Sequence, residues 1–263
     1  MTAIQSARER ARTELTKEIK NEAARQLAAS GAASLSLRAV ARELGMASSA
    51  LYRYFPSRDD LLTALIVDAY NDLGEHAEAA DQTVPPERFR TRLHAICLAV
   101  RTWALSHPNE YALVYGSPVP GYRAPQDTIG PGIRVPLALL RLLGQASSAG
   151  ALTEFPDELS PILAQQVALV GDFAPSKLPA PNLARGVMLW THLFGLVSFE
   201  LFGQFANSMD PADAFFEYSI DRIADVVGLT EDPRVESPAD TAADTAAGTA
   251  ADTAAGTDTG EDR

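Results

Sequence analysis

The chain has 263 residues, 46% of them hydrophobic, and a formal net charge of −12 at pH 7. This length suits one or two domains with a sizeable core, and the lack of a run of about 20 apolar residues argues against a membrane-spanning helix. The single cysteine, Cys97, excludes an intramolecular disulfide framework. Because the charged N-terminal residues also lack the apolar stretch of a signal peptide, we expect a cytoplasmic protein without a membrane partner.

The charge is unevenly distributed along the chain. Residues 1–58 contain ten Lys and Arg against five Asp and Glu, residues 59–229 contain ten against 20, and residues 230–263 contain two against nine. Positive charge is therefore concentrated in the first segment, where a polyanion could dock. We interpret the three segments as an N-terminal domain, a larger second domain and a tail.

The predicted tail, residues 230–263, has low complexity. From Thr241 it repeats Thr-Ala-Ala-Asp and Thr-Ala-Ala-Gly, and it contains no aromatic residue. With almost nothing to bury it is expected to be disordered. Two roles stay open for it, a solubilising appendage and an acidic interaction segment.

The rest of the chain predicts an all-α fold, because alanine and leucine are abundant and alternating β-branched runs are few. A first helix is predicted over residues 4–29, and a second over residues 37–44 follows the N-cap Ser36. A third, over residues 48–54, is closed by Pro56. Residues 57–60 then form a capping box that opens a fourth helix through Leu73.

The second domain is predicted to contain further helices separated by proline and glycine. They cover residues 87–105, 108–115, 137–149, 161–170 and 182–205, with a Pro- and Gly-rich loop over residues 116–136. The last helix has Asp210 as its predicted N-cap and Pro211 as its first residue, and it ends before Gly228.

The second and third helices form a predicted helix-turn-helix, since two short helices are joined by a turn that contains Gly45. In the third helix Ala47, Leu51 and Phe55 fall on one side and can pack against the second helix. The other side carries two i, i+4 pairs, Ser48 with Tyr52 and Ser49 with Arg53. Small residues at the start of such a helix allow close approach to base edges in the major groove of DNA.

The residue types on this exposed side suit DNA. Ala50 can contact a thymine methyl group and Arg53 can reach guanine, whereas Tyr52, Tyr54 and Arg58 are suited to phosphate oxygens. Ser36 places a helix N-terminus where it can also bind phosphate. The predicted DNA contacts are Ser36, Arg38, Ala47, Ser48, Ser49, Ala50, Tyr52, Arg53, Tyr54 and Arg58.

Residues 36–62 resemble the DNA-binding domain of the TetR (tetracycline repressor) family, and the resemblance extends over residues 12–72. It rests on Ser36 at the start of the first short helix, on Gly45 in the turn and on the Leu-Tyr-x-x-Phe pattern that begins at Leu51. Arg58 stands where the family usually has lysine. The resemblance implies a homodimer, a palindromic DNA operator and a C-terminal domain that binds a small effector, so that the protein is expected to be a repressor released by that effector.

The C-terminal region resembles one subgroup of the family. Residues 189–195 approximate its Trp-x-x-His-Gly pattern, with Leu193 and Phe194 inserted before Gly195. Effector pockets are mostly apolar with a few polar groups, and tyrosine supplies both. The candidate residues for a small apolar or aromatic ligand, each of which could instead belong to the core, are Trp103, His107, Tyr111, Tyr115, Tyr122 and His192.

Two C-terminal helices are apolar on most faces, which predicts that one face packs on a second subunit. The alternative is a large monomeric core. The candidate dimer contacts are Trp190, Phe194, Val197, Leu201, Phe216 and Ile220.

The sequence offers no catalytic, cofactor or metal site. The four histidines lack metal-ligand spacing, no phosphate loop or nucleophile elbow occurs, and Cys97 lies among apolar residues as an inert thiol. We therefore expect a DNA-binding regulator rather than an enzyme. The alternative is a helical ligand-binding or interaction protein whose helix-turn-helix no longer reads DNA.

Overall fold

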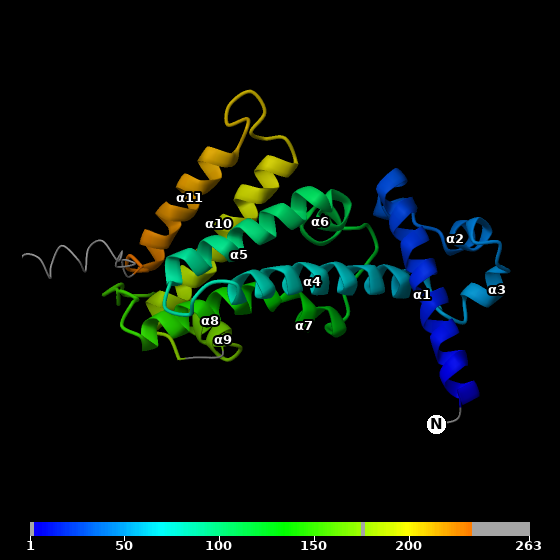
Figure 1. The fold of residues 1–263 in the computed structure, drawn as a ribbon, viewed down its shortest axis with the longest axis horizontal. Helices are drawn as coiled ribbons and strands as arrows, with labels where there is room; N and C mark the ends of the chain where they lie inside the picture. Colours follow the sequence, from blue (N-terminus) through cyan, green and yellow to red (C-terminus); the bar gives the residue numbers. More distant parts are fainter. Residues whose placement is uncertain (1–2, 175–176, 233–263) are drawn as a thin grey trace, which may run out of the picture. The chain divides into compact units, whose positions relative to one another are not determined.

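The computed structural model describes residues 3–174 and 177–232, and helices make up most of this part of the chain (Figure 1). In chain order the elements are α1 (Ala3–Ser30), η1 (Ala32–Ser34), α2 (Leu37–Glu43), α3 (Ser48–Leu51), α4 (Arg58–Gln82), α5 (Phe89–Ser106), α6 (Pro108–Tyr115), η2 (Gln126–Thr128), α7 (Ile129–Gly132), α8 (Arg134–Ser148), α9 (Pro161–Gly171), α10 (Ala180–Leu201) and α11 (Asp213–Val227). Within the described ranges no β-strand forms, and an isolated antiparallel bridge pairs Leu152 with Leu229. The predicted all-α fold is confirmed.

Across residues 3–174 and 177–232, no helix is long and apolar enough to cross a membrane. The repeats predicted to be disordered lie outside the described residues, as do positions 1, 2, 175 and 176.

Local sequence signals explain helices α2 and α3. Ser36 caps α2 by accepting a hydrogen bond of 3.4 Å from the amide three residues further on. Gly45 has a φ of +64°, which lies in the left-handed region that favours glycine. The third helix is shorter than predicted, because the chain tightens after Leu51 and the amide of Arg53 bonds to the carbonyl only three residues back.

A first hydrophobic core joins α1, α2, α3 and the beginning of α4. Its buried members are Ile19, Ala23, Leu27, Leu35, Leu37, Val40, Ala41, Leu51, Phe55, Leu61, Leu62, Leu65 and Ile66. Within each helix they recur at spacings of three and four, which places them on one face. All of them come from residues 19–66, so this core is assembled from neighbouring helices and holds α3 by its buried side.

Helix α4 belongs to two cores. Ser57 accepts a hydrogen bond from the amide of Asp60 at 3.1 Å and donates its hydroxyl to the carboxylate of the same residue at 2.7 Å, which confirms the predicted cap. The helix then continues to Gln82, beyond the predicted end near Leu73. Its first half contributes to the core around α3, and Ala69, Leu73 and Ala77 contribute to a second core.

The second core is formed mainly by α4, α5, α8, α10 and α11, and two buried arginines connect these helices. Arg101 on α5 donates to both carboxylate oxygens of Glu200 at 2.6 and 2.7 Å and to Asp213 at 3.0 Å. Arg92 donates to both carboxylate oxygens of Asp81 at 2.8 and 3.0 Å. Paired in this way, the buried cations join α5 to α4, α10 and the start of α11.

Two predicted helix starts in the second domain are wrong, and α10 ends at Leu201 instead of residue 205. The predicted loop over residues 116–136 contains η2 and α7, and α8 already begins at Arg134, whose guanidinium donates to Glu78 on α4 at 2.7 Å. The last helix begins at Asp213 with Ala212 as its N-cap, instead of beginning at Pro211. At both positions an ion pair with another helix holds the first residue, and this tertiary contact outweighs the local signal.

Candidate nucleic-acid interface and ligand cavity

The residues predicted to meet DNA lie on the accessible side of the helix-turn-helix. Leu51 is fully buried and holds α3 against the first core. Arg38, Ser49, Tyr52 and Arg53 are exposed, and Ser36, Ser48, Ala50 and Tyr54 are partly exposed. Ala47 was expected to pack beside Leu51, but it is the N-cap of α3 and is exposed. The fold leaves this side of α3 open to a partner, and the contact of each residue with DNA stays a prediction.

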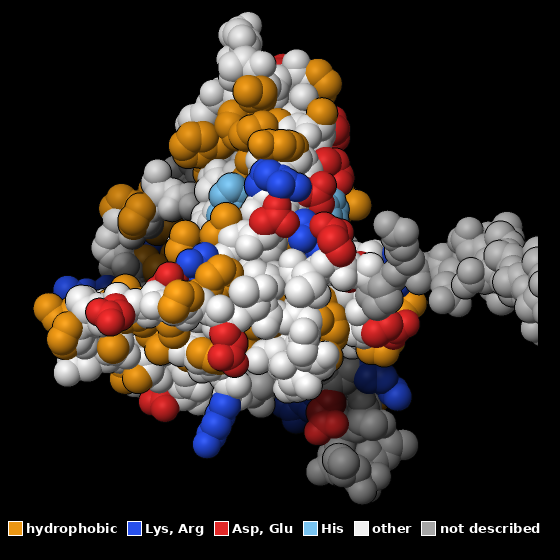
Figure 2. Space-filling view, turned by 90° about the vertical axis from the view of Figure 1, so that its left-hand side faces the viewer, with side chains coloured by type: hydrophobic (Ala, Val, Ile, Leu, Met, Phe, Trp, Pro, Cys, Tyr) orange, Lys and Arg blue, Asp and Glu red, His pale blue; other side chains and the backbone are white. Residues whose placement is uncertain are grey.

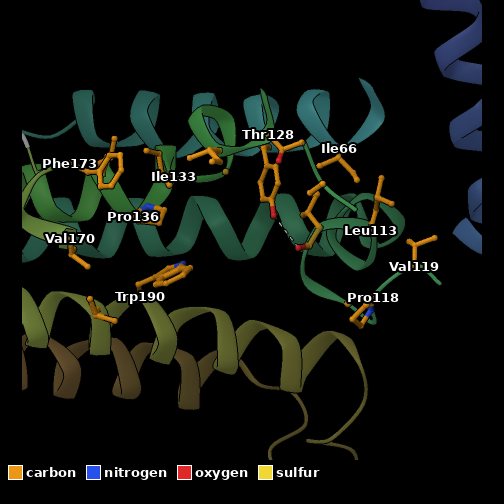
Figure 3. A pocket seen from close by; sticks show the side chains of 18 of the residues that line it. Ile66, Leu113, Pro118, Val119, Thr128, Ile133, Pro136, Val170, Phe173 and Trp190 are labelled. Carbon is orange, nitrogen blue, oxygen red and sulfur yellow. Dashed lines mark hydrogen bonds between the residues drawn. The ribbon is translucent and has the colours of Figure 1, made fainter. Parts of the chain in front are cut away.

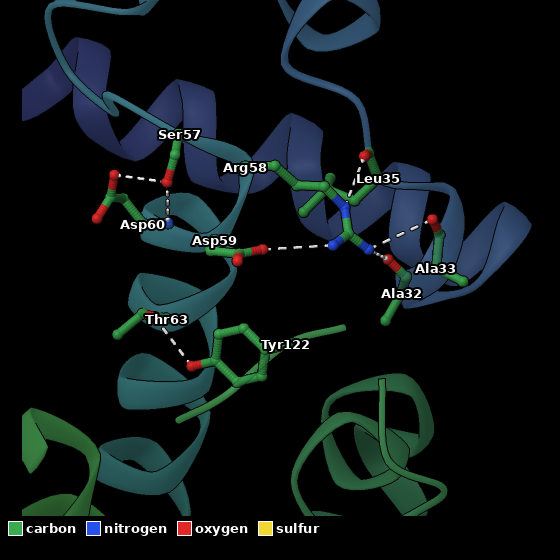
Figure 4. Close-up of polar contacts among 9 residues, drawn as sticks. All are labelled: Ala32, Ala33, Leu35, Ser57, Arg58, Asp59, Asp60, Thr63 and Tyr122. Atoms are coloured by element: carbon green, nitrogen blue, oxygen red, sulfur yellow. Dashed lines mark hydrogen bonds and ion pairs between the residues drawn. The ribbon is translucent and has the colours of Figure 1, made fainter. Parts of the chain in front are cut away.

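Arg58 has a different environment from the other predicted phosphate contacts. Its guanidinium donates to the carbonyl oxygens of Leu35 at 3.1 Å, Ala32 at 2.7 Å and Ala33 at 3.3 Å, and it lies 3.4 Å from the carboxylate of Asp59 (Figure 4). These bonds tie the first residue of α4 to the chain between α1 and α2. The geometry gives Arg58 a positioning role for the whole helix-turn-helix.

A cavity of about 710 Å³ lies in the second domain, close to the first (Figure 3). Helices α4, α6, α7, α8, α9 and α10 contribute to its wall, together with the chain after α6. Figure 3 shows Ile66, Leu113 and Val119 at the end of the cavity nearest to α1, and Phe173 and Trp190 towards its other end. Pockets of this volume hold drug-sized molecules.

The wall of this cavity carries no charged side chain among its described residues. Two of its hydroxyl groups already have partners within the protein, since Tyr70 donates to the carbonyl of Val114 at 3.3 Å and Thr128 donates to the carbonyl of Pro125 at 2.7 Å. The Nε1 atom of Trp190 is buried and has no hydrogen-bond partner. A charged ligand would lose its hydration in this cavity without a compensating ion pair, so the wall suits a neutral, mainly apolar molecule.

Of the six predicted effector residues, only Tyr122 lines this cavity. Trp103 and His107 stack at 5.1 Å in a separate crevice of about 230 Å³ beside α1, where the indole of Trp103 donates to Asp72 at 2.6 Å. Tyr115 borders a groove beside α6. His192 borders none of the cavities described here, because it lies on the outer side of α10. The prediction placed these aromatic residues in one pocket, whereas the fold distributes them over several sites.

Tyr111 is a core residue. It is fully buried, and its hydroxyl donates to the carbonyl of Phe194 at 3.1 Å and lies 2.9 Å from the hydroxyl of Ser198. Burial raises the pKa of Tyr111 to about 12, and burial also raises the pKa of its neighbour Tyr115. The two tyrosines pack with the Phe194 ring, so they serve the second core rather than the cavity.

Sequence reasoning missed several residues of the cavity wall. Ile66 and Tyr70 are an i, i+4 pair on α4, and this spacing could have shown that the apolar face of α4 continues past the first domain. Trp190 was assigned to a dimer contact because its helix is apolar on most faces. Only the packing of α10 decides that this indole faces the cavity.

Four of the other residues predicted to form dimer contacts are buried in the core of their own subunit. Phe194, Val197, Phe216 and Ile220 are at most 7% exposed and belong to the second core, and Leu201 packs against it. The prediction that these four contact a partner is wrong, because a side chain enclosed in its own core is not available to a second chain.

The cavity and the first domain share part of their structure. Ile66 is buried in the core around α3 and also lines the cavity. Tyr122, from the chain after α6, packs against that core, and its hydroxyl lies 2.9 Å from the hydroxyl of Thr63 on α4 (Figure 4). A molecule that fills the cavity therefore touches side chains that also position the first half of α4.

A helix-turn-helix held by one small core, followed by a helical domain with an apolar cavity, defines a class of DNA-binding regulators. Comparison with known proteins agrees with this class. Residues 19–65 match the family model "Bacterial regulatory proteins, tetR family", and residues 93–223 match "Tetracyclin repressor-like, C-terminal domain". The chain belongs to the TetR family of transcriptional regulators.

Curated relatives support this membership. The chain is 40% identical over 212 residues to the HTH-type transcriptional regulators Mb1846 of Mycobacterium bovis and Rv1816 of Mycobacterium tuberculosis, covering 78% of this chain and 89% of each relative. Among solved structures, the candidate regulatory protein SCO4313 is 34% identical, with a TM-score of 0.67 over 82% of this chain and 97% of that chain.

Two of the sequence predictions are settled by these findings. The predicted DNA-binding transcriptional regulator is confirmed, and the alternative of a helical protein with a degenerate helix-turn-helix is not supported. The subgroup suggested by the Trp-x-x-His-Gly pattern stays a prediction.

Proposed function

We propose that this protein is a homodimeric repressor that binds a palindromic operator through α3 and leaves it when a neutral, mainly apolar ligand fills the 710 Å³ cavity. The observation that carries the proposal is that the cavity and the DNA-binding domain share a side chain. Ile66 lines the cavity and is also buried in the core around α3. A ligand that binds better to one arrangement of α4 than to another shifts the population of the two arrangements.

The DNA-reading part of the proposal is tested first, with operators that the full-length protein selects from fragmented genomic DNA. A symmetric site is expected for a two-fold dimer. Arg53→Ala should cost about 1–3 kcal/mol and relax the sequence preference at one position of each half-site. Arg42→Ala is the matched control, because it removes the same charge from an exposed residue of α2. Equal losses in both variants would contradict a base-reading role for Arg53.

The proposed dimer face is the exposed stripe of α10 and α11. Met188 and Phe199 on α10 are 50% and 54% exposed and lie at helical spacing, Phe202 directly after the helix is 43% exposed, and Tyr218 on α11 is 62% exposed. Gly195 lies on the same stripe with open space where a Cβ would be, so a second helix could approach closely there. Figure 2 shows hydrophobic side chains gathered near the top of the molecule, towards the end of α10 and its connection to α11.

Two glutamate variants test this face. Phe199→Glu is expected to convert the dimer to a monomer in sedimentation analysis, because it places a charge in the apolar contact. Leu169→Glu is the control, since Leu169 is 64% exposed on α9, away from the proposed face. A dimer that persists in Phe199→Glu and dissociates in Leu169→Glu would place the interface on α9 instead.

The ligand part is tested by screening neutral apolar compounds for release of the operator in fluorescence anisotropy. An active compound should also change the tryptophan fluorescence, and Trp190→Phe should remove that change because Trp190 lines the cavity and Trp103 does not. Release caused only by charged compounds, without a Trp190 signal, would contradict the proposed ligand class.

A further inference from the structure

The first helix extends well beyond the domain it belongs to. Helix α1 begins at Ala3, whereas the match to the family's DNA-binding domain begins at residue 19. Every side chain from residue 7 to residue 14 is exposed, and the first core of the described residues begins to cover the helix only at Leu15 and Ile19. Figure 1 shows the first turns of α1 running past α2 and α3.

One face of this helix changes its chemistry where the domain ends. Leu15, Ile19 and Ala23 lie on the face that packs into the first core. The same line is continued towards the N-terminus by Arg12 and Arg8, because positions 8, 12, 15, 19 and 23 follow the spacing of one helical face. The arginines replace apolar residues on this face, so at Arg8 and Arg12 the helix faces an anion or water instead of the protein core.

This overhanging face points towards the recognition segment. The guanidinium of Arg12 lies 5.7 Å from the ring centroid of Tyr54, the residue three positions after the end of α3. Within residues 3–174 and 177–232, neither Arg8 nor Arg12 forms an ion pair. Glu14, which would repel phosphate, is on the opposite side of the helix, together with Arg10 and Lys17.

We propose that the N-terminal overhang of α1 is a second DNA-binding element, in which Arg8 and Arg12 contact backbone phosphates outside the sequence read by α3. The inference rests on the proposed role of α3, because Tyr54 and Arg53 fix which side of the molecule meets DNA. Contacts to phosphate add affinity and carry no base information. The overhang of residues 3–18 is about 24 Å long at 1.5 Å per residue, which corresponds to about seven base pairs.

The test compares two duplexes with the full-length protein. One carries the selected operator cut to its symmetric core, and the other adds about seven base pairs of unrelated sequence on each side. For the wild-type protein we expect tighter binding to the longer duplex. Arg8→Ala/Arg12→Ala should lose this gain. In a dimer it should also make the slope of log K against log salt shallower by about 3 to 4, since four phosphate contacts are lost.

A matched variant separates this role from general electrostatics. Arg10→Ala/Lys17→Ala removes the same charge from the same helix but from its other face, and it should keep the gain from the longer duplex. Arg8→Lys/Arg12→Lys should restore most of the gain, because lysine also neutralises phosphate. Thermal unfolding of the free variants shows whether the loss of the Arg12–Tyr54 contact affects folding instead.

The possible failures are distinguishable. If wild type and Arg8→Ala/Arg12→Ala gain equally from the longer duplex, the overhang does not contact DNA, while the proposed function of α3 stands. If both double-alanine variants lose the gain equally, the effect is one of net charge and the inference is wrong. If the wild-type protein selects no DNA site at all, it is the proposed function that fails.

Discussion

The two hydrophobic cores of this protein are built in opposite ways. The core around α3 is assembled from residues 19–66 and is held by short-range contacts and by the caps at Ser36 and Ser57. The second core draws on residues 69–229 and borders a cavity of about 710 Å³. The two regions therefore suit different roles. A core filled by neighbouring helices can present a rigid surface, whereas the helices around a cavity can change their arrangement when a ligand fills it.

The polar contacts follow the same division. In the first domain they are hydrogen bonds between close neighbours or from Arg58 to nearby carbonyls. In the second domain Arg101 binds Glu200 and Asp213, which follow it in the sequence by 99 and 112 positions. Helix α4 contributes buried residues to both cores, so a change in one region can reach the other through it.

The largest effect is expected from breaking the long-range contacts of the second region. Arg101→Ala leaves the largely buried carboxylate of Glu200 without its cation, and removal of one partner from a buried pair costs about 3–5 kcal/mol of unfolding free energy. Urea unfolding checks this. Arg42→Ala removes an exposed arginine paired at 3.6 Å and should cost at most about 1 kcal/mol. Similar costs for both variants would show that Arg101 does not hold the helices together.

The same truncation should lower the free energy of unfolding more in the first core than in the wall of the cavity. Leu51→Ala removes a fully buried side chain from the first core and should cost about 2–5 kcal/mol, because the neighbouring helices cannot close the space. Leu137→Ala removes the same atoms from the cavity wall and should cost less than about 2 kcal/mol, because part of that side chain already faces empty space. Equal costs in denaturant unfolding would contradict the contrast between the cores.

Filling the cavity should separate ligand binding from stability. Val187→Phe adds a ring from α10 into existing space, so the free energy of unfolding should change by no more than about 1 kcal/mol. Binding of a neutral apolar dye such as Nile red should be lost, while operator binding is retained. Ile162→Phe, at a position 72% exposed on α9, is the control and should bind the dye as wild type does. Unchanged dye binding in Val187→Phe would place the ligand elsewhere.

The smallest effect is expected from His192 on the outer side of α10. Desolvation lowers the pKa of His192, and a backbone hydrogen bond with Ser219 on α11 opposes this shift. With the folded pKa below the unfolded one, the unfolded state takes up the proton first as the pH falls. The contribution of His192 is therefore present above the ordinary histidine pKa of about 6.5 and is lost as the pH falls below it. His192→Gln should reduce the pH dependence of the unfolding free energy in this window, and an unchanged dependence would contradict the assignment.

Much of the first domain could be predicted from the sequence because its signals are local. Ser36, Gly45 and Ser57 act on the residues next to them, and the spacing around Leu51 identifies the buried side of α3 without knowledge of any distant contact. The limits of α3 could not be predicted, since the chain keeps helical spacing for one more turn with tighter hydrogen bonds.

The ligand cavity was predicted less well, because aromatic residue type does not reveal which way a side chain faces. Trp103, Tyr111 and Tyr122 are all aromatic with one polar group. Trp103 donates to Asp72 beside α1, Tyr111 is enclosed in the core and Tyr122 lines the cavity. On α10 the sequence is apolar on most faces, so periodicity could not distinguish Trp190 at the cavity from Phe199 on the outer side.

The sequence by itself determined the class of this protein, its helical fold and the side of α3 that is left open, since these follow from caps, turns and spacing within a few residues. Only the tertiary structure decided where the cavity lies, that α4 belongs to both cores, and which side of α10 is free. These features depend on contacts between residues far apart in the chain, such as Tyr122 with Thr63 and Arg101 with Glu200, whose pairing no local pattern specifies.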